Sequence, residues 1–280
     1  MQNSPEAALS GATRVYYIVG DPIAQVKSPA GVSQSFHERG RNAYVMPAHV
    51  APADLARWLN GVSAAKNVDG IIVTIPHKFA AFDLCATTSE RGRFLRAVNT
   101  LRRNADGSWH GDMLDGLGFV AAMTQNGCSA TGQKALLVGA GGAGSAIAHA
   151  LVVAGVRELA VFDDDTARRA ALIARLSELK KCPVVAGSPD PGGFELLVNA
   201  TPAGMLFSDT LPVQMDAVTA DMQVGCVITA PAITPLIAQA RAKGCRTVTG
   251  TQMFGKVRDL MVDFFLQPDH APTEAKPDAH

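Results

Sequence analysis

The amino-acid sequence predicts an α/β protein of two domains, and three observations support this fold class. Apolar, strand-like runs alternate with helical patterns along most of the chain, which is typical of βαβ units and parallel sheets. A glycine-rich turn, Gly139–Gly144, joins the apolar run 135–138 to the alanine- and leucine-rich segment 145–153. The 280 residues are enough to form two hydrophobic cores of modest size.

The order of strand, glycine turn and helix identifies the second domain as a Rossmann-type dinucleotide-binding domain. In this pattern Gly139 allows the tight turn, Gly141 lets the backbone approach a pyrophosphate, and Gly144 lets helix and strand pack closely. The N-terminus of the helix then faces the phosphates, because its unpaired N–H groups favour an anion. The predicted cofactor-binding residues of this turn are Gly139, Ala140, Gly141, Gly142, Ala143 and Gly144.

The first domain is expected to begin with the strand Arg14–Gly20 and to alternate strands with helices. Ser28 followed by Pro29 is a typical helix start, with the serine as N-cap. Strands at 97–103 and 108–113 form a hairpin, because the Asp-Gly pair between them supplies turn chemistry. The other expected elements are a helix from 28 to about 39, a strand at 43–50, a helix at 52–63 and an apolar strand at 70–75.

Asp115 begins a predicted helix that runs to about Asn126 and connects the two domains. The elements expected after it are strands at 135–138, 158–162, 184–185, 195–199, 224–229 and 246–249, and helices at 145–153, 166–179, 235–243 and 252–266. The predicted substrate-side domain is therefore 13–114, completed by the final helix, and the predicted Rossmann domain is 115–251. Disordered tails are expected at 1–12 and 267–280.

The composition favours a small-molecule ligand. Twenty-five basic residues balance 25 acidic ones, so no charged field points to nucleic acid or to a membrane surface. No apolar run is long enough to span a membrane, and the first residues lack the blocks of a secretion signal, so a cytoplasmic location is expected. The five cysteines have no metal-ligand spacing, and no metal site is predicted. The oligomeric state, monomer or homodimer, stays open.

Eight groups of residues, in the same order along the chain, resemble those of shikimate dehydrogenases and their quinate-oxidising relatives. They are Gly20–Ile23 with Ser28–Pro29, Val73–Lys78, Ala97–Thr100, Asp115–Gly116 with Gly118, the glycine turn, Asn199–Thr201 with Gly204–Met205, Thr234–Leu236, and Gly250 with Met253. The resemblance covers nearly the whole chain outside the tails. It implies an N-terminal substrate domain, a Rossmann cofactor domain, a catalytic cleft between them, and a final helix that packs on the first domain.

The resemblance also implies the roles of individual residues. The implied catalytic pair is Lys78, as acid/base, with Asp115 as its partner. The implied substrate-binding residues are Ser28, Thr74, Asn99 and Thr229. The residues implied to lie near the nicotinamide half of the cofactor are Thr201, Met205 and Gly250.

The chemistry of alcohol oxidation explains why a lysine is useful there. Oxidation of a secondary alcohol with a nicotinamide cofactor takes a hydride from carbon and a proton from oxygen, so a nearby group must exchange that proton. The predicted reaction is the reversible oxidation of a ring hydroxyl of shikimate, to 3-dehydroshikimate, or of quinate. Two alternatives stay open: a non-catalytic, NAD-binding regulatory paralogue, and a dehydrogenase of a different cyclic polyol acid.

The prediction of the cofactor rests on Asp163–Asp165, at the end of the second Rossmann strand. A carboxylate at this place accepts hydrogen bonds from the ribose 2′-hydroxyl of NAD and repels a 2′-phosphate. Members of the family that use NADP usually carry Asn-Arg-Thr here. We therefore predict NAD as the preferred cofactor, with Asp163 as the 2′-hydroxyl partner. NADP is the possible second cofactor, with Arg168 or Arg169 turned towards the phosphate.

Several substrate-side positions depart from the family pattern. Val26 replaces one of two carboxylate-binding hydroxyls, which removes a hydrogen bond to a bound carboxylate unless Lys27 replaces it. Thr229 stands for the usual tyrosine, Val257 for a glutamine of the final helix, and Met113–Leu114 for an Asn-Thr pair. The pattern predicts a divergent paralogue that acts on a related cyclic polyol acid, or weakly on shikimate.

Overall fold

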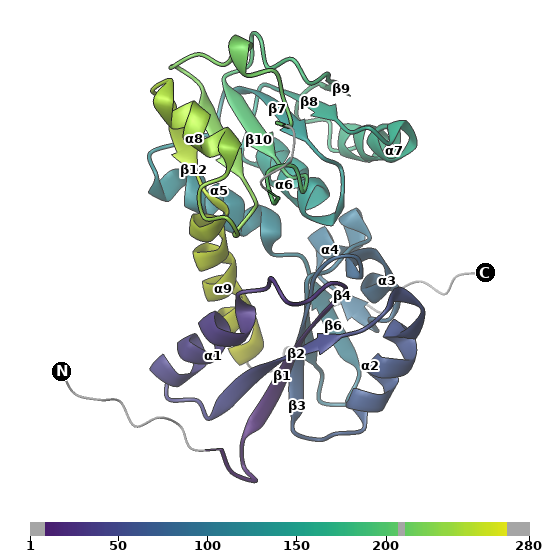
Figure 1. The fold of residues 1–280 in the computed structure, drawn as a ribbon. Helices are drawn as coiled ribbons and strands as arrows, with labels where there is room; N and C mark the ends of the chain where they lie inside the picture. The colour runs from purple at the N-terminus through teal and green to yellow at the C-terminus, as the bar shows by residue number, and fades with distance from the viewer. Residues whose placement is uncertain (1–8, 207–210, 268–280) are drawn as a thin grey trace, which may run out of the picture. The chain divides into compact units, whose positions relative to one another are not determined.

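The structure, a computed structural model, describes residues 9–206 and 211–267 and divides into two compact units (Figure 1). The first unit holds the residues up to Leu114 together with those from Arg258 onward, and the second is Asp115–Val257. The last helix, α9 (Gly250–Leu266), therefore contributes to both units. Of the predicted tails, 1–8 and 268–280 lie outside the described residues, whereas 9–12 lead into a turn closed by a hydrogen bond from Thr13 N–H to Ser10 O.

The first unit is built on a mixed sheet, whose order within the described chain is β2-β1-β3-β5-β6-β4. Its strands are β1 (Arg14–Gly20), β2 (Ala43–His49), β3 (Val68–Val73), β4 (Thr87–Thr88), β5 (Thr100–Arg103) and β6 (Trp109–Asp112). β1 pairs in parallel with β2 and β3, as the alternating pattern predicts. The predicted hairpin is also present, and it places β5 antiparallel to both β3 and β6.

The helices of the first unit differ in detail from the sequence-based prediction. They are α1 (Ser28–Glu38), α2 (Leu55–Ser63), α3 (Lys78–Asp83) and α4 (Glu90–Leu95), with a 3₁₀ turn at Pro52–Asp54 ahead of α2. The N-cap prediction for α1 is wrong by one residue. Lys27 occupies the cap position without a side-chain hydrogen bond, and Ser28 is already helical. The six-residue helices α3 and α4 were not predicted, because they are too short to show helical periodicity.

The end of α9 packs on the sheet of the first unit. The Phe265 ring lies 4.8 Å from the Tyr16 ring, centroid to centroid. A Cβ atom built on Gly70 would lie 2.4 Å from Phe265 Cε1, so only glycine at this position of β3 leaves room for the ring. The first unit thus needs residues from both ends of the chain to complete its core.

The second unit is a parallel, doubly wound sheet, which confirms the predicted Rossmann-type fold. The order of its strands in the described part of the chain is β12-β11-β10-β7-β8-β9. The strands are β7 (Lys134–Val138), β8 (Glu158–Phe162), β9 (Val184–Ala186), β10 (Leu196–Asn199), β11 (Gln223–Cys226) and β12 (Arg246–Val248). The helices are α5 (Asp115–Gln125), α6 (Gly142–Val153), α7 (Thr166–Ser177) and α8 (Pro235–Ala242), with a 3₁₀ turn at Met215–Ala217.

Two boundaries in the second unit affect the site. Helix α6 begins at Gly142, three residues before the predicted start at Ser145, because the glycines of the turn themselves form its first turn. Strand β11 ends at Cys226 rather than at Thr229, so Thr229 lies in the loop that follows.

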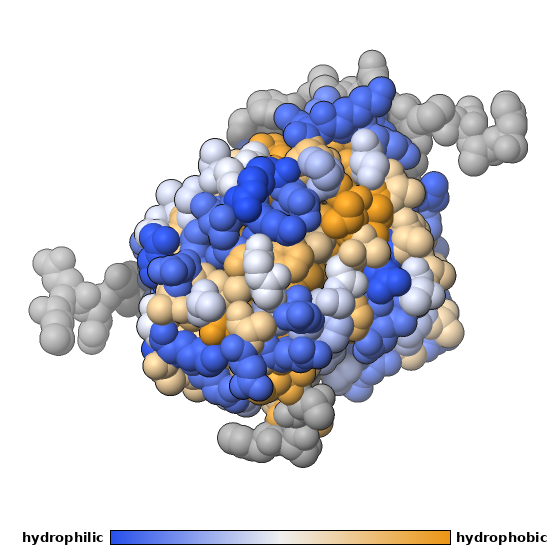
Figure 2. Space-filling model, turned by 90° about the horizontal axis from the view of Figure 1, so that it is seen from above, coloured by the Kyte–Doolittle hydropathy of each residue, from blue (hydrophilic) through white to orange (hydrophobic). Residues whose placement is uncertain are grey.

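One face of the molecule is mixed in polarity. The face seen from above in Figure 2 shows hydrophilic residues with smaller apolar areas between them. No helix among the described residues combines the length and the apolar character that crossing a membrane requires.

Candidate active site

The predicted substrate residues of the first unit, Ser28 apart, gather at one edge of its sheet. Strands β1, β3 and β6 run in the same direction, because β5 is antiparallel to both β3 and β6. Their carboxyl ends and the start of β5 therefore lie at one edge, where ligands bind in open α/β sheets. Thr74 follows β3, Asn99 precedes β5, and Asp112 ends β6 at this edge.

Thr74 is held beside the end of β1. Its N–H donates to Val19 O at 3.0 Å, and a Cβ atom on Gly20 would lie 2.4 Å from Thr74 Cγ2. Glycine at position 20 is thus required by the close approach of the two chain segments. The loop that leaves Gly20 leads to a half-buried Val26 and a buried Ser28 at the start of α1.

Lys78 and Asn99 are brought together by backbone hydrogen bonds. Lys78 is the first residue of α3, and its carbonyl oxygen accepts from Val98 N–H at 3.0 Å. The carbonyl oxygen of Asn99 accepts from Val73 N–H at 2.8 Å. The buried His77 ring, with Nε2 2.8 Å from Val50 O, fixes the turn immediately before the lysine.

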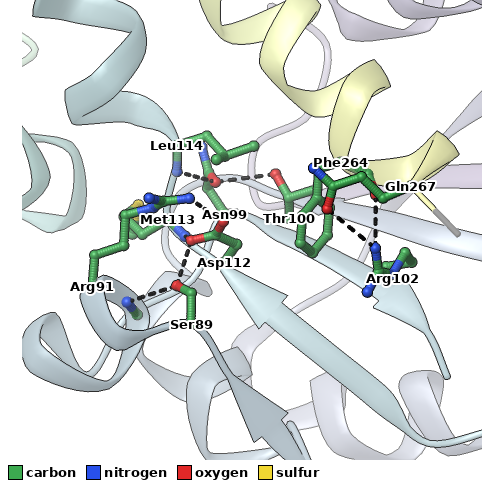
Figure 3. Close-up of polar contacts among 11 residues, drawn as sticks. Ser89, Arg91, Asn99, Thr100, Arg102, Asp112, Met113, Leu114, Phe264 and Gln267 are labelled. Atoms are coloured by element: carbon green, nitrogen blue, oxygen red, sulfur yellow. Dashed lines mark hydrogen bonds and ion pairs between the residues drawn. The ribbon is translucent and has the colours of Figure 1, made fainter. Parts of the chain in front are cut away.

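The side chain of Asn99 is buried and oriented by two donors (Figure 3). Its Oδ1 accepts from Leu114 N–H at 2.9 Å and from Thr100 Oγ1 at 3.1 Å. Because the carboxamide is planar, an oxygen fixed in this way directs the NH₂ group elsewhere. Asn99 is thus arranged as a hydrogen-bond donor on its other side.

A buried acidic network, which the sequence did not reveal, lies next to Asn99. Asp112 Oδ1 accepts from Met113 N–H at 2.7 Å and from Ser89 Oγ, and Oδ2 pairs with Arg91 (Figure 3). The backbone carbonyl of Asp112 accepts from Asn99 N–H at 2.9 Å. No sequence motif marks these residues, because Arg91 and Asp112 are brought together only by the tertiary fold.

Met113, Leu114 and Val257, which differ from the residues usual in the family, are buried packing residues in the structure. The side chains of Met113 and Leu114 are buried, and only their backbone N–H groups reach Asp112 and Asn99. Val257 is also buried and packs so tightly on α5 that a Cβ atom on Gly118 would lie 2.3 Å from its Cγ2.

In the second unit, the glycine turn has the geometry that a pyrophosphate requires. Gly139 adopts a φ of +101°, which strongly favours glycine. A Cβ atom on Gly144 would lie 1.9 Å from Gly139 O, so only glycine fits between helix and strand. Around Gly141, by contrast, no atom lies within 4 Å of a built Cβ, so the backbone at the N-terminus of α6 is open to a ligand. These residues fit the phosphates of a dinucleotide.

Thr201 lies next to this turn at the topological switch point. The strand order reverses between β7 and β10, and ligands bind at such points in doubly wound sheets. A Cβ atom on Gly139 would lie 2.9 Å from Thr201 Cγ2. The buried Asn199 orients the threonine, since its Oδ1 accepts from Thr201 N–H at 3.0 Å and from Thr201 Oγ1 at 2.7 Å.

The remaining predicted residues of the second unit occupy separate places. Asp115 is the buried first residue of α5, and Thr229 lies half-buried in the loop after β11. Met205 is exposed, whereas Gly250 lies so close to Ile228 that a Cβ atom would be 2.2 Å from the Ile228 carbonyl oxygen. The pairing of Asp115 with Lys78 stays a prediction.

Asp163 makes contacts within the protein that the sequence did not reveal, and its role towards a ribose stays a prediction. Its side chain is 6% exposed, and its two oxygens accept from Ala140 N–H at 2.7 Å, from Asp165 N–H at 2.8 Å and from Arg168 Nη2 at 2.7 Å. Burial alone would raise the pKa of this carboxyl, but the hydrogen bonds from Arg168, Ala140 and Asp165 outweigh it and lower the pKa below its ordinary value. Asp163 thus ties the glycine turn to helix α7.

The comparisons with known proteins agree with this geometry. Residues 18–101 match the family model described as the shikimate dehydrogenase substrate binding domain. The chain is 33% identical over 252 residues to shikimate dehydrogenase (NADP(+)) of Rhodospirillum rubrum, which covers 88% of this chain and 89% of that protein. This chain belongs to the shikimate dehydrogenase family. It is accordingly an oxidoreductase.

Solved structures of this family and its neighbours have the same fold. Quinate dehydrogenase from Corynebacterium glutamicum in complex with NAD is 29% identical, with a TM-score of 0.83 over 92% of this chain and 95% of that one. Ligand-free 5-ketofructose reductase of a Gluconobacter strain is 27% identical, with a TM-score of 0.81 over 91% of this chain and 93% of that one. Residues 121–172, which include the glycine turn, also match the ThiF family model.

The comparisons bear on the type of cofactor, and the structure bears on metal binding. They support a nicotinamide cofactor, but the name of the Rhodospirillum relative favours NADP⁺, and the predicted preference for NAD finds no support in it. A structure of a relative in complex with NAD shows that both forms occur among similar proteins. Among the residues that the structure describes, no three His, Cys, Asp or Glu side chains are grouped as metal ligands.

Proposed function

We propose that this protein catalyses the reversible oxidation of a ring hydroxyl of shikimate, to 3-dehydroshikimate, or of quinate. Lys78 is the acid/base in this proposal, and Asp115 is its partner. The observation that carries it is the place of Lys78 at the carboxyl edge of the first sheet, tied through Val98 to the Asn99 segment. Membership of the shikimate dehydrogenase family supplies the class of substrate.

The residues proposed to act on the substrate have distinct tasks in this reaction. In the oxidation, the substrate hydroxyl gives its proton to the neutral Nζ of Lys78, and the hydrogen on the same carbon leaves as hydride. The NH₂ group of Asn99 donates a hydrogen bond to a substrate oxygen, and the hydroxyls of Thr74 and Ser28 bind further polar groups of the substrate. Asp115 orients the amine. In the reverse direction the Lys78 ammonium returns the proton to the carbonyl oxygen.

The second unit holds the cofactor in this proposal. A nicotinamide cofactor, when bound, supplies the hydride acceptor. The backbone of Gly139–Gly144 binds its pyrophosphate, and Thr201, Met205 and Gly250 lie near its nicotinamide half. The first unit, with the end of α9, is the substrate domain, and Asp115–Val257 is the cofactor domain.

We propose NAD as the preferred form, although the name of the curated relative favours NADP⁺. The support is electrostatic. Arg168, one of the two arginines that could bind a 2′-phosphate, already pairs with Asp163 at 2.7 Å and lies 3.7 Å from Asp165. A phosphate would have to compete with two carboxylates for this guanidinium, whereas a neutral 2′-hydroxyl would not.

A polyol without a carboxylate is the second candidate substrate. Val26 offers no hydroxyl where the family resemblance places one of two carboxylate-binding groups. The Gluconobacter protein of similar fold is named for 5-ketofructose, a sugar that carries no carboxylate. A non-catalytic, NAD-binding regulator is a weaker alternative, since a sensor has no need of a proton-transfer lysine.

We also propose a cytosolic location, which the free cysteines of the described chain favour.

The experiment that tests the function measures initial rates with shikimate, quinate and 5-ketofructose, each paired with both nicotinamide cofactors in the appropriate redox state. Lys78→Ala serves as the control for adventitious activity. Turnover that depends on Lys78 supports the proposal, and the ratio of rates identifies the substrate. An absence of turnover with every pair, despite cofactor binding, would contradict it and favour the regulatory alternative.

A further inference from the structure

Asp112 is a buried acidic residue to which the proposed reaction assigns no role. It ends β6 at the carboxyl edge of the first sheet, and its carboxylate is almost completely buried. Burial of a charged group is costly unless it is paired and hydrogen-bonded. Asp112 meets this condition through Arg91, whose side chain is 33% exposed, and through Ser89 and Met113 N–H.

The network joins two segments that are distant in the sequence, the start of α4 and the end of β6. Ser89 Oγ accepts from Gly92 N–H at 3.1 Å and so caps helix α4, and it also donates to the Asp112 carboxylate. Arg91, in the first turn of the same helix, reaches the other carboxylate oxygen. Figure 3 shows Asp112 between these two residues and the strand end that carries Met113.

Asp112 is connected to Asn99 in two ways. The Asp112 carbonyl accepts from Asn99 N–H at 2.9 Å, which sets the backbone of Asn99. The Asp112 carboxylate accepts from Met113 N–H, which sets the direction of the chain towards Leu114. Leu114 N–H in turn donates to Asn99 Oδ1 and fixes which way the carboxamide faces.

We propose that Asp112, neutralised by Arg91 and held by Ser89, is a positioning residue that presents the Asn99 NH₂ group to the substrate. This inference rests on the proposed function, in which Asn99 binds a substrate oxygen. The negative charge is needed because two N–H or O–H donors and a guanidinium converge on one side chain, and only an ionised carboxylate accepts all three. The network also sets the direction of the chain into residue 115, the partner proposed for Lys78.

The test compares Asp112→Asn and Arg91→Met with the conservative Arg91→Lys. The matched control is Asp69→Asn, which removes the Arg14–Asp69 ion pair at the opposite edge of the same sheet. We expect kcat/KM for the substrate to fall about 10- to 100-fold in the first two variants, because small displacements of binding groups have effects of this size. Arg91→Lys and Asp69→Asn should stay within about threefold of the wild type, as expected for substitutions that keep the cation or lie far from the edge.

Two readouts separate positioning from a merely structural role. Cofactor affinity should not change, because the glycine turn belongs to the other unit. A structural role alone would lower the melting temperature of Asp112→Asn and leave kcat/KM of the folded enzyme at the wild-type value, and this result would overturn the inference. Arg91→Met keeps the test available if Asp112→Asn does not fold.

Hydrogen–deuterium exchange provides a readout that does not depend on activity. The amides of Asn99 and Leu114 are the donors that the network orders. We expect faster exchange at residues 98–101 and 112–115 in Asp112→Asn and Arg91→Met, and unchanged exchange there in Asp69→Asn. If the wild type turns over no substrate, the proposed function fails. Faster exchange at these residues would then still support the network, and unchanged exchange would overturn it.

Discussion

The carboxylate of Asp163 accepts a hydrogen bond of 2.7 Å from the backbone N–H of Ala140, so the acid that follows β8 is tied to the glycine turn that follows β7. This contact gives the acid a role within the protein itself, besides the one expected towards a ribose. It orients a peptide unit of the turn, and its charge is balanced by Arg168. Under the proposed preference for NAD, this one side chain couples the conformation of the turn to the choice of cofactor.

Substitution of two glycines of the turn should affect cofactor binding and the stability of the second unit differently. Gly144→Ala should destabilise the second unit by about 1–3 kcal/mol, because its Cβ would meet Gly139 O, and it should weaken cofactor binding. Gly141→Ala should leave the unfolding free energy nearly unchanged, since its surroundings are open, yet weaken binding by blocking the approach of the pyrophosphate. Denaturant unfolding and cofactor titration measure the two effects. Equal loss of stability in both variants would contradict this reading of the turn.

Asp163→Asn should shift the cofactor preference towards NADP. The substitution keeps an acceptor for Ala140 N–H but removes the charge that holds Arg168, so the guanidinium can turn to a 2′-phosphate. We expect the ratio of kcat/KM for NADP to that for NAD to rise about tenfold or more, the size of a charge-assisted hydrogen bond. Glu178→Gln, which removes an exposed charge at the end of α7, is the control. A constant ratio in Asp163→Asn would show that Arg168 does not reach the phosphate.

Lys78→Ala should lower kcat about 10²- to 10⁴-fold, the usual contribution of a positioned acid/base group. Its effect on folding should be small, because the side chain is partly exposed at the start of α3. Steady-state kinetics and circular dichroism test both statements. Lys66→Ala, an exposed lysine of the same unit, is the control for loss of charge. Wild-type kcat in Lys78→Ala would remove the lysine from the mechanism.

Val26→Ser tests whether the substrate carries a carboxylate near the start of α1. If it does, the new hydroxyl should lower KM about 10-fold or more, as a charge-assisted hydrogen bond does. Val26→Ala removes the apolar bulk without adding a donor and should leave KM nearly as it is. An unchanged KM in Val26→Ser, for a substrate that is turned over, would favour the polyol without a carboxylate.

His110 should make the first unit less stable in mild acid. Its ring is partly buried, with Nδ1 2.8 Å from Thr87 Oγ1, and burial, aided by the charge of Arg102, lowers the pKa of the folded state below 6.5. The unfolded chain then binds more protons near this pH, so the contribution is complete above about pH 6.5 and is lost as the pH falls through the folded pKa. The unfolding free energy of the wild type should therefore fall more than that of His110→Gln between pH 7.5 and pH 5. Between pH 7.5 and pH 9 the difference between the two proteins should be constant.

The features that were predicted from the sequence are those that depend on neighbouring residues. The glycine turn is an example, because the requirement for a positive φ at Gly139 and for close packing at Gly144 follows from local geometry. The alternation of strands and helices likewise indicates the parallel core of each sheet. Asp165 caps helix α7, since its side chain accepts a hydrogen bond from Arg168 N–H.

The features that could not be predicted depend on tertiary contacts. No local sequence pattern pairs Arg91 with Asp112. Nor does the Met113–Leu114 pair show that the backbone N–H groups of these residues, rather than their side chains, make the hydrogen bonds to Asp112 and Asn99. Asp163 was expected to face a ribose, and its contacts with Ala140 and Arg168 appear only when two βα loops are placed side by side.

The position of Phe265 has a consequence for the order in which the protein is made. The second unit is one continuous stretch, so it can fold as soon as residue 257 has left the ribosome. Most of the first unit is synthesised earlier, but it needs Phe265 to cover Gly70 and Tyr16, and this residue emerges only after the second unit. During translation, one face of the N-terminal sheet therefore lacks part of its cover until α9 emerges, although Phe36 of α1 already packs on Tyr16 and the sheet is the older part of the nascent chain.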